Sequence, residues 1–125
     1  KVEVGLFRKT ASKSTIQWRK LSEPSVLDDI VSESWNKPVI IFKHSTRCSI
    51  STMVKSRLES SWNYRDEEMP IYYLDLIQHR NISDKIAAKF KVKHASPQVL
   101  VIKDGVPVYH TSHNDIRPEI FESFL

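Results

Sequence analysis

Apolar residues in the first half of this chain change from a strand-like run to a helix-like spacing within about 20 positions. Residues 39–42 are apolar without interruption, which is typical of a central strand covered on both faces. After a polar stretch, apolar residues return at intervals of three and four, a spacing that predicts a helix over about 48–60 with a buried stripe of Ile50, Met53, Val54 and Leu58. The pattern therefore predicts a buried strand followed directly by an amphipathic helix.

The same pattern predicts the other elements. In chain order they are a strand at 16–18, a helix from a capping box at Ser25 and Asp28 to about Trp35, a strand at 71–75, a helix starting at 81–84, strands at 98–103 and 106–111, and a closing helix from Pro118 to Leu125. Asp104-Gly105 between the last two strands is a strong hairpin signal, because a type I′ turn needs two positive φ angles. A strand-helix-strand unit with parallel strands followed by an antiparallel hairpin is the order of the thioredoxin fold, an α/β fold whose central mixed sheet has helices on both faces.

Length and composition predict one soluble domain. The 125 residues fit a single thioredoxin-like domain over 1–125, in which residues 1–15 are expected to be a mobile extension. No apolar run approaches the roughly 20 residues that span a bilayer, and a single cysteine forbids an internal disulfide, so a cytoplasmic location without membrane contact is expected. The three tryptophans, Trp18, Trp35 and Trp62, are expected to be core or half-buried packing residues.

The net charge of +4 favours an anionic ligand without identifying one. Nucleic acid and acidic thiol cofactors both fit this charge. Lysine and arginine are, however, spread along the chain with acidic residues among them, and the densest basic group lies near the N-terminus. We therefore do not expect nucleic acid as a partner.

The single cysteine, Cys48, is the strongest candidate for chemistry. It follows the strand at 39–42 where the next helix should begin, and the free N–H groups and dipole of a helix start stabilise an anion such as a thiolate. The alternative is a small buried hydrophobic residue, as most free cysteines are. Its polar and cationic neighbours, among them Ser45 and Arg47, favour a reactive thiol instead.

Three neighbours are candidates for supporting the thiolate. Thr46 could cap the helix, and Arg47 could stabilise the thiolate or contact an anionic cofactor, although a solvated surface role is equally compatible with its position. Ser51 stands three residues after Cys48, where dithiol oxidoreductases have a second cysteine. Ser51 is equally consistent with an ordinary first-turn residue that bonds to the backbone.

Three segments of the sequence resemble the monothiol bacilliredoxin-like proteins of the bacillithiol redox system. They are FKHSTRCSIS at 42–51, VKHASPQVLVIKDG at 92–105 and SHNDI at 112–116, and the resemblance extends over roughly 26–125. The family usually has proline, glutamate and threonine at three positions where this chain has Ser49, Ala95 and Arg117.

This resemblance implies a substrate groove opposite Cys48. In the thioredoxin fold a cis-proline loop faces the reactive cysteine, which assigns Ser96 and Pro97 to substrate binding; the alternative is an ordinary trans proline at a strand start. His94 and His113 are expected to orient loops or line the groove. The pairs His44/Cys48 and His110/His113 have spacings compatible with zinc, but a closed site normally uses more thiolates, so no metal is expected.

The leading hypothesis is a monothiol thiol-disulfide oxidoreductase. Cys48 would remove bacillithiol, or a similar low-molecular-weight thiol, from S-thiolated proteins, with that thiol as co-substrate and no tightly bound cofactor. A free thiol or a disulfide reductase would regenerate Cys48. The competing hypothesis is a non-catalytic redox sensor or adaptor that is modified at Cys48 under stress.

Overall fold

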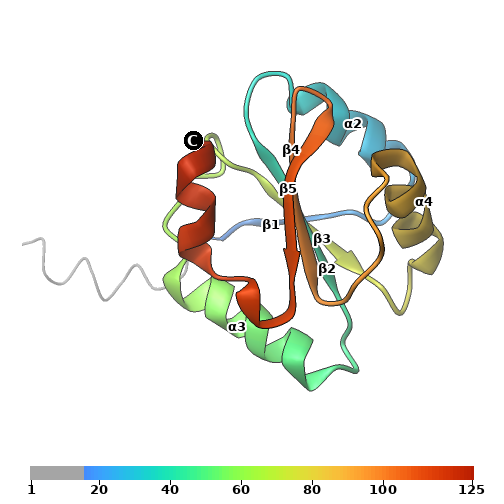
Figure 1. Ribbon diagram of the computed structural model, residues 1–125, viewed down its shortest axis with the longest axis vertical. Coiled ribbons are helices and arrows are strands. Elements are labelled where there is room, and N and C mark those ends of the chain that lie inside the picture. The colour runs from blue at the N-terminus through green and yellow to red at the C-terminus, as the bar shows by residue number, and fades with distance from the viewer. Residues whose placement is uncertain (1–15) are drawn as a thin grey trace, which may run out of the picture.

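A five-stranded mixed sheet forms the centre of the computed structural model, which describes residues 16–125 (Figure 1). The expectation of a mobile extension at 1–15 lies outside these residues. The strand order is β1-β3-β2-β4-β5, with β1 and β2 parallel to β3, and with β4 antiparallel to β2 and β5. The elements are β1 (Trp18–Lys20), α2 (Ser25–Glu33), β2 (Val39–His44), α3 (Ser49–Ser61), β3 (Ile71–Asp75), α4 (Arg80–Phe90), β4 (Gln98–Lys103), β5 (Val106–Ser112) and two 3₁₀ helices, η1 (His113–Asp115) and η2 (Pro118–Phe124). The predicted thioredoxin-like α/β architecture is confirmed.

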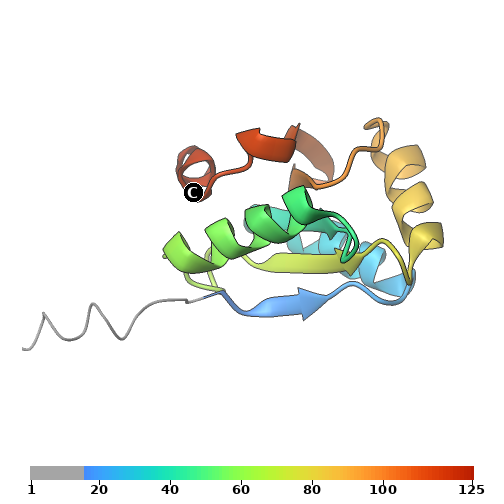
Figure 2. The same cartoon turned by 90° about the horizontal axis from the view of Figure 1, so that it is seen from below.

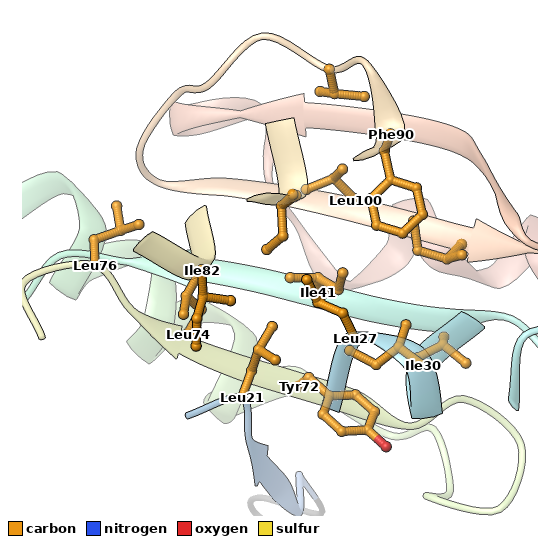
Figure 3. Close-up of a cluster of buried hydrophobic side chains, with 14 residues drawn as sticks. Leu21, Leu27, Ile30, Ile41, Tyr72, Leu74, Leu76, Ile82, Phe90 and Leu100 are labelled. Atoms are coloured by element: carbon orange, nitrogen blue, oxygen red, sulfur yellow. The ribbon is translucent and has the colours of Figure 1, made fainter. Parts of the chain in front are cut away.

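Helices cover both faces of the sheet, as Figures 1 and 2 show. On one face α2 and α4 pack against alternate strand residues, and Figure 3 shows this cluster with Leu27, Ile41 and Leu100 at its centre. On the other face α3 and η2 pack against Phe42 and Val101. Because successive strand residues point to opposite faces, Lys43 shares the α4 face with Ile41, and His44 shares the α3 face with Phe42.

The first two elements differ from the prediction at their starts. The first strand is Trp18–Lys20 rather than 16–18, in register with Ile71–Tyr73 of β3. The expected capping box is absent, because Pro24 is the N-cap of α2 and makes no side-chain cap hydrogen bond. Instead, the Val26 N–H donates to the Glu23 carbonyl and the Leu27 N–H to that of Pro24, so the backbone turn itself starts the helix.

The buried face of α3 also differs from the prediction. Val54 and Leu58 are fully buried as expected, but the third buried residue is Ser51. Ile50 and Met53 are 39% and 50% exposed. Because Ser51 faces the core, these two apolar side chains lie on the outer side of the helix, which begins directly after Cys48.

The end of the chain confirms the predicted tight turn and corrects the type of the last helix. Asp104 and Gly105 have φ angles of 54° and 79°, as the hairpin signal requires. The closing helix is 3₁₀ over Pro118–Phe124 rather than α-helical.

One of the three tryptophans is not a core or half-buried packing residue. Trp18 is half-buried and Trp62 is buried as expected, but Trp35 is 63% exposed, because its ring lies over Gly105 instead of entering the core.

Candidate active site around Cys48

Cys48 is the N-cap residue of α3. Its backbone is extended, with φ −113° and ψ 120°, and its carbonyl accepts hydrogen bonds from the Thr52 N–H at 3.0 Å and the Thr52 hydroxyl at 3.2 Å. The side chain is only partly buried. The predicted position at a helix start is therefore confirmed, and the alternative of a fully buried hydrophobic cysteine is excluded.

The loop before Cys48 is held by hydrogen bonds from its backbone N–H groups to Ser45. The Cys48 N–H donates to the Ser45 carbonyl at 3.2 Å, and the Arg47 N–H donates to the Ser45 hydroxyl at 3.3 Å. Thr46 and Arg47 are exposed. Thr46 is not the helix cap, because Cys48 occupies that position and α3 has no side-chain cap hydrogen bond. Whether Arg47 supports the thiolate stays a prediction.

Ser51 lies in the first turn of α3 and is completely buried. Its Oγ is 2.7 Å from Nδ1 of His44 and accepts a hydrogen bond from the Ser45 N–H at 3.1 Å. The backbone-bonding interpretation of Ser51 is thus confirmed, with His44 as a second partner. This hydroxyl joins the end of β2 to the helix that carries Cys48.

The sequence suggested only one role for His44, that of a possible zinc ligand paired with Cys48. It is 4% exposed, and its ring packs against Phe42 and Tyr73 at centroid distances of 5.7 and 5.6 Å. Burial lowers the pKa of His44, as does the charge of Lys55, against smaller opposing effects that include the charge of Asp75. The imidazole is therefore neutral at pH 7.

The loop before β4 contains Ser96 and Pro97, which were expected to face Cys48. The Ser96-Pro97 peptide bond is cis, as expected. The Pro97 carbonyl accepts a hydrogen bond from the His113 N–H at 3.0 Å, so two of the predicted substrate-binding residues meet. Gln98, the next residue, is in register with Lys43 of β2. This loop therefore starts at the edge of the sheet where β2 ends and the Cys48 loop begins.

The predicted residue His94 lies on the same loop and is joined to α4. Its Nδ1 is 3.3 Å from the hydroxyl of the buried Ser83. Partial burial lowers the pKa of His94, as do the charges of Lys43 and Arg80, whereas the charge of Asp84 raises it. The electrostatic environment of His94 is thus mainly cationic.

Lys43 was not among the residues that the sequence predicted for the site. Its side chain is fully buried, and its ammonium Nζ has no hydrogen-bond partner in the described part of the chain. Two other buried polar atoms there also lack partners, Oγ of Ser96 and Oε1 of Gln98. All three residues lie where β2 ends and β4 starts. The signal in the sequence is a lysine directly after the apolar run 39–42, at a position where the strand continues.

Residues 16–125 contain neither a candidate metal site nor a candidate membrane-spanning helix. No group of three or more His, Cys, Asp or Glu side chains in this range could hold a metal ion. None of the helices in the same range is long and apolar enough to cross a membrane.

The fold and the thiol at the start of α3 define the class as a thioredoxin-fold thiol redox protein. A solved protein assigned as an oxidoreductase with a thioredoxin fold is 34% identical, with a TM-score of 0.72, and the match covers 85% of this chain and 91% of that one. Thioredoxins from Malassezia sympodialis and Fasciola hepatica share the fold at 14% and 17% identity. Their TM-scores are 0.66 and 0.59, and the matches cover 88% and 84% of this chain and 89% and 93% of theirs.

The family is narrower than this class. Residues 19–120 match the family described as Monothiol bacilliredoxin BrxC. The chain therefore belongs to the monothiol bacilliredoxin family, as the resemblance of its three segments implied.

Proposed function

We propose that this protein removes bacillithiol, or a similar low-molecular-weight thiol, from cysteines of S-thiolated proteins. The observation that carries the proposal is the position of the only cysteine, partly buried at the N-cap of α3 in a chain of the monothiol bacilliredoxin family. A helix N-terminus with unpaired N–H groups stabilises the thiolate that performs thiol-disulfide exchange.

The proposed reaction proceeds in two exchanges. The Cys48 thiolate attacks the small-thiol sulfur of the mixed disulfide, which forms a bond between the two sulfurs and releases the protein cysteine as a thiolate that takes a proton from water. A second small-thiol thiolate then attacks the small-thiol sulfur bound to Cys48, giving the symmetrical small-thiol disulfide and free Cys48. A disulfide reductase would return that disulfide to thiols.

The surroundings of Cys48 support an external thiol as the resolving group. Ser51 stands where a dithiol enzyme has its second cysteine, and its hydroxyl is buried against His44. Ile50 and Met53 are exposed on α3, the helix that begins after Cys48, and these apolar side chains suit contact with a protein substrate. We assign the small thiol to the side of Ser96, Pro97, His94 and His113, with Thr46 and Arg47 at the rim, and place the reaction in the cytoplasm.

The test follows the small thiol by intact mass. A bacillithiol-modified protein is incubated with a sub-stoichiometric amount of this protein, with and without free bacillithiol. We expect one small-thiol adduct on Cys48 without free thiol, and complete removal from the substrate over many turnovers when free thiol is present. Cys48→Ser should abolish transfer, while Ser56→Ala, an exposed change on the same helix, should not alter it.

Other outcomes would assign a different role. Uptake of one equivalent that free thiol does not turn over would indicate a redox sensor or adaptor. Transfer by Cys48→Ser equal to that of the unmodified sequence would contradict the oxidoreductase proposal.

A further inference from the structure

Lys43 has a position that folding alone does not explain. Its side chain is fully buried on the α4 face of the sheet, and its ammonium has no hydrogen-bond partner among residues 16–125. Burying an unpaired charge costs free energy. A buried polar group without a partner in a native fold indicates a strained or functional site, or a bound group that completes it.

Several charged groups gather around this ammonium. Arg80 begins α4, and His94 lies on the loop that leads to Ser96-Pro97; both are exposed. The hydrogen bond between Ser83 and His94 ties that loop to the first turn of α4. The acidic group in the cluster is Asp84, which is also exposed, so two cationic side chains and a histidine share one carboxylate.

The first turn of α4 adds to this positive potential. The N-cap residue, His79, makes no side-chain cap hydrogen bond, so the helix start is not neutralised by a side-chain oxygen. The partial positive charge of an 11-residue helix therefore adds to that of Arg80. Such an N-terminus beside a buried unpaired ammonium has the composition of an anion-binding site.

We propose that Lys43, Arg80 and His94 form a subsite for a carboxylate of the low-molecular-weight thiol that becomes disulfide-bonded to Cys48. Arg80 and His94 contact the carboxylate at the surface. The buried ammonium of Lys43 attracts the carboxylate through the protein interior, which screens charges less than water does. This subsite rests on the proposed function, because it selects which thiol the groove accepts. One of its members, His94, lies on the same loop as Ser96-Pro97, where the small thiol is expected.

A competition between two small disulfides tests the subsite. The protein is incubated with the symmetrical disulfides and thiols of 2-mercaptoethanol, which is neutral, and 3-mercaptopropionate, which carries a carboxylate. In each reaction the Cys48 thiolate bonds to one sulfur of the probe and the other sulfur leaves as a thiolate. The two adducts are quantified by intact mass, and their ratio is divided by the ratio for a short cysteine peptide.

We expect the normalised ratio to favour the carboxylate by about tenfold at low salt, the size of one charge-assisted hydrogen bond. Lys43→Met and Arg80→Gln should each bring the ratio close to one. Lys85→Gln, which removes an exposed positive charge from the same helix, should leave it unchanged. A ratio near one in the unmodified sequence, or an equal fall in Lys85→Gln, would overturn the subsite while leaving the thiol chemistry intact.

A second measurement separates failure of the subsite from failure of the proposed function. If Cys48 forms neither adduct, the proposed function fails, and the subsite is tested without thiol chemistry by titrating the Cys48→Ser protein with succinate. Saturable NMR shifts at the amides of Arg80 and His94 that are lost in Cys48→Ser/Lys43→Met would support the subsite. The absence of saturable shifts in Cys48→Ser would contradict it.

Discussion

Nδ1 of His44 lies 2.7 Å from Oγ of Ser51, and both side chains are buried. Ser51 also accepts a hydrogen bond from the Ser45 N–H, so one hydroxyl satisfies a side chain on β2 and a backbone donor in the Cys48 loop. The position that holds a resolving cysteine in dithiol enzymes therefore has a structural role in this chain. It fixes the loop before Cys48 to the helix after it.

Ser51→Ala is expected to lower stability more than it lowers activity. The substitution leaves His44 Nδ1 and the Ser45 N–H without their buried partner, which should reduce the free energy of unfolding by about 1–3 kcal/mol. Small-thiol transfer should largely remain, because Cys48 is unchanged. Urea denaturation with Ser56→Ala as the matched exposed control measures the effect. A loss in Ser51→Ala no larger than in the control would contradict the structural role.

His44 should make the fold sensitive to acid. Its pKa in the folded protein lies below the ordinary 6.5, as does that of His94, so below about pH 6.5 the unfolded chain binds protons that the folded chain does not. The free energy of unfolding should therefore fall as the pH drops from about 7 to about 5.5. His44→Gln should start lower, because it changes the contact with Ser51, but should show a smaller fall over the same interval.

Two measurements check this expectation. Denaturation at both pH values gives the slope, and an NMR titration of the His44 ring gives the midpoint directly. An NMR midpoint for His44 at or above 6.5 would contradict the burial argument.

The sequence was sufficient to predict the order of the elements and the place of Cys48. Local patterns determine both: the apolar run at 39–42 forms a central strand, the Asp104-Gly105 pair takes the two positive φ angles of a tight turn, and the thiol follows the strand at a helix start. These features depend on neighbours a few residues apart, and such short-range preferences persist in the folded protein.

The buried polar contacts were not predictable from local patterns. Helical spacing cannot show that Ser51 faces inward while Met53 faces out, because the partner that pairs with the hydroxyl, His44, lies on another element. Lys43 looks like the polar end of a strand until β4 and α4 enclose it. Tertiary packing decides both cases, and both lie beside the candidate site.

Arg19 should contribute to stability through a half-buried network that joins β1 to three other segments of the chain. Its guanidinium contacts Asp66 at 2.8 Å, both carboxylate oxygens of Glu33 at 3.0 and 3.1 Å, and the Tyr72 hydroxyl at 3.0 Å. The hydrogen bond with Asp66 raises the pKa of Arg19 above its ordinary value, although burial opposes this.

A lysine cannot make this planar set of contacts, so Arg19→Lys should lower the free energy of unfolding by about 1–2 kcal/mol. The control is Arg65→Lys, in an exposed pair with Glu68, which should change it by less than about 0.5 kcal/mol. Thermal and urea denaturation of the two variants give the comparison. Equal effects would mean that the Arg19 network contributes no more than a surface ion pair.

Lys43→Met is expected to make the protein more stable at neutral pH. Burial, together with the charge of Arg80 and against the opposing effect of Asp84, lowers the pKa of Lys43 from the ordinary 10.5 to about 8. Between about pH 8 and 10.5 the unfolded chain holds a proton that the folded chain has lost, so the stability of the unmodified sequence should rise with pH across this window.

At pH 7 both states carry the proton, and the folded state bears the cost of the buried charge, on the order of 3 kcal/mol. Met has a similar length and no charge, so Lys43→Met should recover much of that cost at pH 7 and should remove the rise between about pH 8 and 10.5. Denaturation series from pH 7 to about 10.5, with Lys85→Met as the exposed control, measure both effects. A residue that destabilises the fold is retained when it contributes to binding, so higher stability together with lost carboxylate selectivity is the combined result we expect. A destabilised Lys43→Met protein would instead show that the ammonium has a stabilising partner in solution.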